Sequence, residues 1–229
     1  MCGRYTLKST KAEIEKRFKS YADPGMQFEP NYNACPSSLL PIVTNKKTQT
    51  IINAKWGLVP AWSLNLASQA SFVNATLEGI LTTKSFKGPI ENQRCIVIAD
   101  GYYEWKTIGK IKIPYYVQIN NGELFAFAGI YETNEDTNVL SFSLITMEPN
   151  SKLSFIHHRM PAILSPEQES LWLDSDINGK EAIEIITQYS ESMLNFYTVS
   201  NRINKPGFND ENLIIPYKHE NVATQGDLF

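Results

Sequence analysis

The stretch PYYVQINNGELFAFAGIYE, residues 114–132, constrains the fold more than any other part of this chain. Two runs rich in aromatic and β-branched residues, which are typical of strands, flank Asn121-Gly122. That dipeptide is preferred in tight hairpins because both of its residues accept the positive φ angles of the turn. The stretch therefore predicts a β-hairpin, and with it an antiparallel sheet.

Other segments extend this prediction to the whole chain. Further strand-like runs occur at 39–44, 50–59, 95–99 and 139–146, and helices are predicted at 10–20, 165–173 and 179–189. Thr10 with Glu13, and Ser165 with Gln168, have the spacing of capping boxes at helix starts. No repeat, linker or change of composition divides the chain, so we expect one α+β domain with a mostly antiparallel sheet. Residues from about 207 onward are polar and irregular, and we expect them to be loosely held.

Composition limits the classes of protein and the compartment. The net charge of −3 argues against a protein that coats nucleic acid non-specifically, although it permits a small basic cleft on an acidic body. No apolar run approaches the ~20 residues of a membrane helix, and no basic region precedes an apolar run as in a secretory signal. Cys2, Cys35 and Cys95 cannot all pair, and we read them as reduced thiols of a cytoplasmic protein.

A cysteine follows the first methionine, and this position gives it a chemistry that an internal cysteine lacks. Removal of Met1 would leave Cys2 with a free α-amine beside its thiol. The amine, with an ordinary pKa of ~8, can condense with an aldehyde to form an imine. The thiolate can then close on the imine carbon to form a five-membered thiazolidine. The alternative interpretation is that a cysteine stands at position 2 by accident.

Two stretches add an amide and a carboxylate. In FVNATLE, Asn74 and Glu78 are four residues apart and would share one face of a helix. Asn74 could orient a carbonyl or an imine and Glu78 could pair with a base, although Asn74 could also simply cap the helix. In DGYYEW, Glu104 follows a buried strand among aromatic residues, where burial would raise its pKa and suit it to general acid–base catalysis. A carboxylate that faces solvent is the alternative.

The stretch FIHHRMP contains two of the three histidines of the chain. His157 and His158 titrate near neutral pH, which makes them the obvious candidates for proton transfer. On a strand two adjacent residues point to opposite faces, so one of the two would be the working residue. The pair lacks a zinc-ligand spacing and no Cys/His cluster completes a set, so neither a metal site nor a cofactor is predicted. The thiol, amide, carboxylate and imidazole together fit covalent chemistry on a carbonyl group.

Seven motifs in one order resemble the SRAP (SOS-response-associated peptidase) family, the abasic-site processing proteins. They are MCGRY at 1–5, NYNACP at 31–36, WGLVPAW at 56–62, NATLE at 74–78, ADGYYEW at 99–105, IHHRMP at 156–161 and VSNRIN at 199–204. The combination is specific and covers nearly the whole chain. The resemblance implies a barrel-like antiparallel sheet flanked by helices, in a catalytic domain at 1–207 that is followed by a polar tail at 208–229.

The resemblance also implies a reaction. Family members link their N-terminal cysteine to the ring-opened aldehyde of an abasic site in single-stranded DNA, and the product is a thiazolidine. Carried over to this chain, Cys2 is the nucleophile and Asn74 helps to hold the reacting sugar. Glu104 and His157 handle protons during imine formation, ring opening and reversal of the crosslink. β-Elimination from the imine accounts for the strand-cleaving lyase activity of the family.

DNA contacts carried over from the family lie in a positively lined cleft. Phosphates are met by Arg4, Lys84 and Arg159, a base stacks on Trp62, and the cleft is lined by Pro36 and Thr146. The usual arginines of N-A-R-x-E and R-Y-N are replaced here by Thr76 and Asn31, and Ser63 stands where some members have a second tryptophan. We therefore expect weaker or more salt-sensitive DNA binding than in an arginine-rich member, with the covalent chemistry intact.

The last residues, QGDLF, resemble the short peptides that bacterial replication proteins insert into the sliding clamp. Leu228 and Phe229 would fill an apolar pocket, Gln225 would supply a hydrogen bond, and Asp227 fits the pattern Q-x-[SD]-L-F. The alternatives are a terminus packed on its own domain and a chance match. Clamp binding would bring a cytoplasmic protein, which we expect to be monomeric, to the nucleoid at replication forks.

Two other functions remain open at this level. The family's name implies a thiol peptidase, and N-terminal nucleophile hydrolases use one residue as both nucleophile and amine base, so Cys2 could instead hydrolyse an amide. A non-enzymatic sensor that binds single-stranded DNA and recruits partners is the other alternative.

Overall fold

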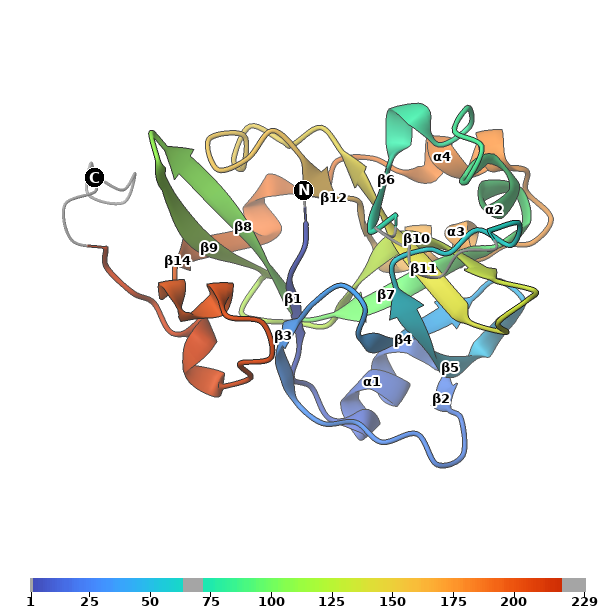
Figure 1. Cartoon of the computed structure of the whole chain (residues 1–229), viewed down its shortest axis with the longest axis horizontal. Helices are drawn as coiled ribbons and strands as arrows, with labels where there is room; N and C mark the ends of the chain where they lie inside the picture. The colour runs from blue at the N-terminus through green and yellow to red at the C-terminus, as the bar shows by residue number, and fades with distance from the viewer. Residues whose placement is uncertain (1, 64–71, 220–229) are drawn as a thin grey trace.

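A computed structural model describes residues 2–63 and 72–219, and these residues form two β-sheets with short helices around them (Figure 1). The first sheet has five strands in the order β14-β9-β8-β1-β3. Their bounds are Leu194–Thr198 for β14, Ile111–Ile119 for β9, Gly101–Ile108 for β8, Tyr5–Leu7 for β1 and Asn31–Ala34 for β3.

The second sheet is nine-stranded and runs in the order β12-β11-β10-β7-β4-β5-β2, with β13 paired to β10 and β6 paired to β11. Its strands are β12 Met160–Pro161, β11 Leu140–Met147, β10 Phe125–Thr133, β7 Arg94–Ala99, β4 Leu39–Thr44, β5 Lys47–Trp56, β2 Tyr21–Ala22, β13 Ile163–Leu164 and β6 Asn74–Thr76.

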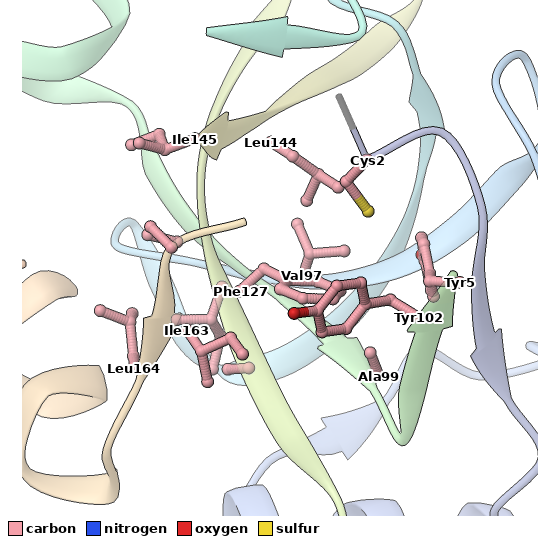
Figure 2. Close-up of a cluster of buried hydrophobic side chains, with 14 of the residues drawn as sticks. Cys2, Tyr5, Val97, Ala99, Tyr102, Phe127, Leu144, Ile145, Ile163 and Leu164 are labelled. Carbon is pink, nitrogen blue, oxygen red and sulfur yellow. The ribbon is translucent and has the colours of Figure 1, made fainter. Parts of the chain in front are cut away.

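Part of the second sheet closes on itself. Because β11 pairs antiparallel with β10 and parallel with β5, the order β10-β7-β4-β5-β11 forms a closed five-stranded barrel. The apolar core contains fully buried aromatic side chains such as Trp56, Phe127 and Phe142, and Figure 2 shows part of it with Cys2 among its members. The predicted α+β class and the mostly antiparallel, barrel-like sheet are confirmed; β5–β11, β6–β11 and β2–β5 are parallel pairs.

The helices are short, and of the four in the described part of the chain three begin within one residue of the predicted starts, whereas the helix over 87–92 was not predicted. They are α1 Lys11–Phe18, α2 Lys87–Asn92, α3 Pro166–Trp172 and α4 Gly179–Ile185, with 3-10 turns η2 Leu77–Gly79, η3 Glu191–Met193, η4 Asn201–Asn204 and η5 Glu211–Ile214. The capping boxes of Thr10 with Glu13 and of Ser165 with Gln168 are both present. Among the described residues, no helix is long and apolar enough to cross a membrane.

The predicted hairpin around Asn121-Gly122 is wrong. A tight turn is present, since the Gly122 N–H donates to the Ile119 carbonyl at 2.9 Å. However, β9 pairs with β8 and β14, whereas β10 pairs with β7, β11 and β13, so the turn carries the chain from one sheet into the other. The turn is centred on Asn120-Asn121 rather than on Asn121-Gly122, and positive φ angles occur at Asn120 and Gly122. The apolar β10 is stabilised by burial in the barrel rather than by its neighbour in sequence.

A second passage between the sheets lies at Asp100, between β7 and β8. Its fully buried carboxylate accepts hydrogen bonds from Thr6 Oγ1 at 2.7 Å and from the backbone N–H groups of Lys8 and Ser9 at 2.7 and 3.0 Å. These bonds fasten the segment around β1 to the start of β8. Asp100 therefore fixes the N-terminal strand, and with it Cys2, against β8.

The tight packing at this junction gives a stability prediction. A Cβ atom at Gly101 would lie 2.0 Å from the Tyr116 hydroxyl oxygen, so Gly101→Ala should lower the free energy of unfolding by ~1–3 kcal/mol through overpacking, as measured by urea denaturation. The matched control is Gly88→Ala in α2, where a Cβ meets nothing within 4 Å; alanine there should be neutral or stabilising by up to ~1 kcal/mol. Equal midpoints for Gly101→Ala and the wild type would contradict this packing.

The first residues of the predicted tail are not loosely held. Leu213 is buried against the first sheet, the Tyr217 N–H donates to the Thr198 carbonyl at 2.8 Å, and His219 Nε2 lies 2.9 Å from the Val199 carbonyl. The proposed clamp-binding residues Gln225, Asp227, Leu228 and Phe229 lie outside the described residues, so clamp binding stays a prediction.

Candidate active site

Cys2 lies three residues before β1, and hydrogen bonds to the backbone carbonyls of Cys2 and Arg4 hold this segment in place. The Tyr103 N–H of β8 donates to the Arg4 carbonyl at 3.0 Å, and Asn74 Nδ2 of β6 donates to the Cys2 carbonyl at 3.0 Å. The Cys2 side chain is fully buried and points into the core beside Tyr102 (Figure 2). Two of the four predicted catalytic residues, Cys2 and Asn74, are therefore in direct contact.

Strand β8 brings the predicted carboxylate to the same place. Residues two apart on a strand share a face, and Tyr102 and Glu104 line one narrow cavity together with His157 and Arg159. Burial raises the pKa of Glu104 to about 7. Burial also raises the pKa of the Cys2 thiol well above its usual range, and the nearby Glu104 charge adds to this effect. The thiol is therefore protonated at neutral pH, while Glu104 can both hold and release a proton.

His157 lies in the turn that precedes β12, not on a strand as the prediction about opposite faces assumed. Its ring stacks on that of His158, with centroids 4.3 Å apart and planes at 27°. Burial lowers the pKa of His157 to about 4, so the ring is neutral at pH 7. The Arg159 backbone N–H donates to His157 Nδ1 at 3.0 Å. The Arg159 carbonyl oxygen also lies 3.2 Å from Nδ1, but the contact with the backbone N–H is shorter and an N–H can only donate, so the proton of the neutral ring is assigned to Nε2.

The stretch 72–78 does not form a helix that would put Asn74 and Glu78 on one face, because Asn74 begins β6 and Glu78 lies in the turn η2. Both side chains nevertheless contact residues of the candidate site. The Glu78 carboxylate accepts a hydrogen bond from each terminal nitrogen of Arg159, at 2.9 Å from Nη1 and 2.8 Å from Nη2. Arg159 Nη2 also donates to the Thr146 carbonyl at 2.6 Å. Arg159, predicted to meet a phosphate, is thus held by two neighbours at the edge of the cavity.

The other predicted DNA contacts do not line the cavity of Glu104 and His157, and they differ in exposure. Trp62 is 55% exposed, and Lys84 Nζ lies 4.2 Å from the centroid of its ring, so these two form one patch in a shallow pocket. Arg4 and Pro36 are half-buried. Thr146 is fully buried in β11, beside β6.

The family model for SOS response associated peptidase (SRAP) matches residues 1–206 of the chain. The chain belongs to the SRAP family. The Bacillus subtilis protein YoqW, named an abasic site processing protein, is 34% identical over an alignment of 221 residues. The alignment covers 93% of this chain and 99% of that protein. The Gallus gallus protein HMCES, with the same descriptive name, is 27% identical over 227 residues, covering 83% of this chain and 67% of that protein.

The family fold is equally clear in three dimensions. A crystal structure of a Bacteroides thetaiotaomicron protein superimposes with a TM-score of 0.86 at 27% identity, and the match covers 95% of this chain and all of that one. The overall architecture of this chain is therefore shared with a solved structure.

In this SRAP chain, several buried polar atoms have no hydrogen-bond partner within the described protein. Those on the candidate site and the strands next to it include Arg4 Nε, Tyr5 Oη, Asn74 Oδ1, Tyr102 Oη and Thr146 Oγ1. Buried polar groups are nearly always paired, so unpaired groups from β6, β8 and β11 favour a site built for a polar ligand. No group of three or more His, Cys, Asp or Glu side chains in the described segments could hold a metal ion.

Two parts of the site were missed by reading the sequence. Tyr102 lines the cavity, and its spacing of two from Glu104 on a predicted strand was the signal that could have revealed it. The bond from Glu78 to Arg159, which leads on to His157, joins residues 81 positions apart, and no local pattern indicates it. Thr76 and Asn31, which replace the usual arginines, lie on β6 and β3 respectively.

Proposed function

We propose that this SRAP protein processes abasic sites in single-stranded DNA by forming a thiazolidine between Cys2 and the ring-opened sugar. The proposal rests above all on the position of Cys2, which Asn74 holds beside a cavity lined by Glu104 and His157. The names of the Bacillus and Gallus relatives, both abasic site processing proteins, support the same substrate.

In the proposed reaction the amine acts before the thiol. Removal of Met1 frees the α-amine of Cys2, which attacks the C1′ aldehyde of the opened sugar to give a carbinolamine. Loss of one water gives an imine. The thiol then adds across the carbon–nitrogen double bond, so that sulfur bonds to carbon and the proton goes to nitrogen. This order follows from burial, which keeps the Cys2 thiol protonated and weakly nucleophilic until the imine is beside it.

The two proton-handling groups take different roles. Glu104, with a pKa of about 7, is the general acid that protonates the departing hydroxyl of the carbinolamine and recovers its proton afterwards. His157 stays neutral and acts as a hydrogen-bond donor through Nε2, because Nδ1 already accepts from the Arg159 backbone. If ring closure is slow, loss of the C2′ proton from the imine expels the 3′ phosphate, which is the lyase reaction.

DNA is held outside the cavity in this proposal. Arg4 and Lys84 contact phosphates, and the exposed face of Trp62 stacks on a base, which requires no particular sequence. Pro36 and Thr146 shape the cleft. Only the abasic sugar reaches Cys2.

A denaturing gel tests the proposal. The full chain is incubated with a single-stranded oligonucleotide that contains one abasic site, and we expect a heat-stable shifted band that is absent for Cys2→Ala. Intact-mass measurement first checks the loss of Met1. Oligonucleotide binding without a covalent band would favour the sensor, and turnover of a peptide without DNA would favour the peptidase; either result without the band rejects the crosslinking function.

A further inference from the structure

The short segment from Asn74 to Glu78 contacts Cys2 at one end and Arg159 at the other. At its start, Asn74 Nδ2 donates to the Cys2 carbonyl at 3.0 Å. Four residues later, Glu78 accepts two hydrogen bonds from Arg159 at 2.8 and 2.9 Å. Strand β6 fixes this segment by pairing with β11. Strand β6 and the turn η2 therefore connect Cys2 with the segment that carries His157 and Arg159.

Arg159 is the connecting residue, and its contacts leave it little freedom. Its terminal nitrogens donate to both oxygens of Glu78 and to the Thr146 carbonyl, and its side chain is only 13% exposed. Its backbone N–H donates to His157 Nδ1 at 3.0 Å. A side chain anchored at its far end restrains its own backbone, so the Glu78 contact restrains the group that fixes the His157 ring.

The nature of this contact suits positioning. A carboxylate that accepts both terminal nitrogens of a guanidinium has a fixed geometry as well as a favourable charge interaction. Thr76, two residues before Glu78, supplies no second cation, although arginine is usual at this position of the family motif. In this chain the charge of Glu78 is matched by Arg159, the ion-pair partner found among the described residues.

We propose that Glu78 is a positioning residue which, through Arg159, holds His157 in the neutral form protonated at Nε2. Glu78 does not touch the reacting atoms. Its effect on the reaction rests on the proposed function, but its effect on the ring of His157 does not.

The first test measures which nitrogen of the His157 ring carries the proton. The histidines are labelled with 15N, and His157→Gln identifies which of the three sets of ring signals belongs to residue 157. In the wild type we expect the signature of a single form protonated at Nε2. In Glu78→Gln, which removes the charge and one acceptor oxygen, we expect a mixture of the Nδ1–H and Nε2–H forms. An unchanged His157 signature in Glu78→Gln would overturn the proposal.

The control for the loss of any bidentate ion pair is Glu169→Gln. Glu169 accepts both terminal nitrogens of Arg17, at 2.7 and 2.9 Å, and joins α3 to α1 instead of contacting the 157–159 turn. This variant should leave the His157 signals as in the wild type. A change of the same size in Glu169→Gln would show that the ring responds to general loosening, and would also overturn the proposal.

The second test is kinetic. At saturating abasic oligonucleotide, Glu78→Gln should slow adduct formation by ~10-fold, less than the ~10²–10⁴-fold that a general acid–base group itself contributes, because His157 is still present but less well positioned. In a His157→Gln background the same substitution should have no further effect, because the group that it positions is gone. An equal slowing in both backgrounds rejects the proposal. If the wild type forms no adduct, the proposed function fails, whereas the ring signals still decide the role of Glu78.

Discussion

Placing one residue ahead of Cys2 is expected to abolish the heat-stable DNA adduct although the thiol remains. A glycine inserted between Met1 and Cys2 converts the α-amine of Cys2 into an amide nitrogen, which cannot form an imine. The thiol alone can add to an aldehyde only reversibly, and such an adduct does not survive a denaturing gel. The measurement is adduct yield on an abasic oligonucleotide, with intact mass confirming that only Met1 was removed. A wild-type yield from the inserted variant would contradict the thiazolidine.

The complementary variant separates the two groups of Cys2. Cys2→Ser keeps the free α-amine but lacks the sulfur that closes the ring, so it should stop at the imine. Borohydride reduces an imine to a stable amine, and we therefore expect Cys2→Ser to give a band only when borohydride is present. The glycine insertion still has a free α-amine, but on glycine and without an adjacent thiol, so it too should give no band in the absence of borohydride. Both variants retain the carbonyl that accepts from Asn74, so the comparison leaves that contact in place.

Local signals in the sequence predicted local structure well. The capping boxes at Thr10 and Ser165 were correct because a cap depends on residues three positions apart. A turn formed next to the predicted dipeptide, at Asn120-Asn121, yet its two strands entered different sheets. A turn sets how two strands leave it over a few residues, but the pairing of β10 depends on barrel neighbours that come from distant parts of the chain.

The candidate site shows the same division. The predicted residues Cys2, Asn74, Glu104 and His157 lie around one place in the structure, although their local conformations differ from those predicted at Asn74 and His157. Their chemistry was readable because residue type alone limits it. Their pKa values and the tautomer of His157 could not be predicted from the sequence. The low pKa of His157 comes first from burial by other segments, and its tautomer from the backbone amide of Arg159.

Replacing Glu104 with glutamine should lower the rate of adduct formation by ~10²–10³-fold at the optimum and change the shape of its pH profile. A general acid must be protonated, so with a pKa of about 7 the Glu104 contribution declines as pH rises through 7. The α-amine must be neutral, so its contribution rises through its ordinary pKa of ~8. The wild-type rate should therefore be bell-shaped with a maximum between these values. Glutamine cannot donate a proton, so Glu104→Gln should lose the alkaline decline and rise to a plateau.

His157→Gln is the control that assigns this decline to Glu104. Because the pKa of His157 is lowered to about 4, its ring stays neutral across the working range and contributes no change near pH 7. His157→Gln should therefore lower the rate at every pH but keep the bell. Rates are measured as single turnovers at saturating abasic oligonucleotide from pH 5.5 to 9. A decline that persists in Glu104→Gln and disappears in His157→Gln would reverse the two roles, and would place the titrating proton on the imidazole instead of the carboxyl group.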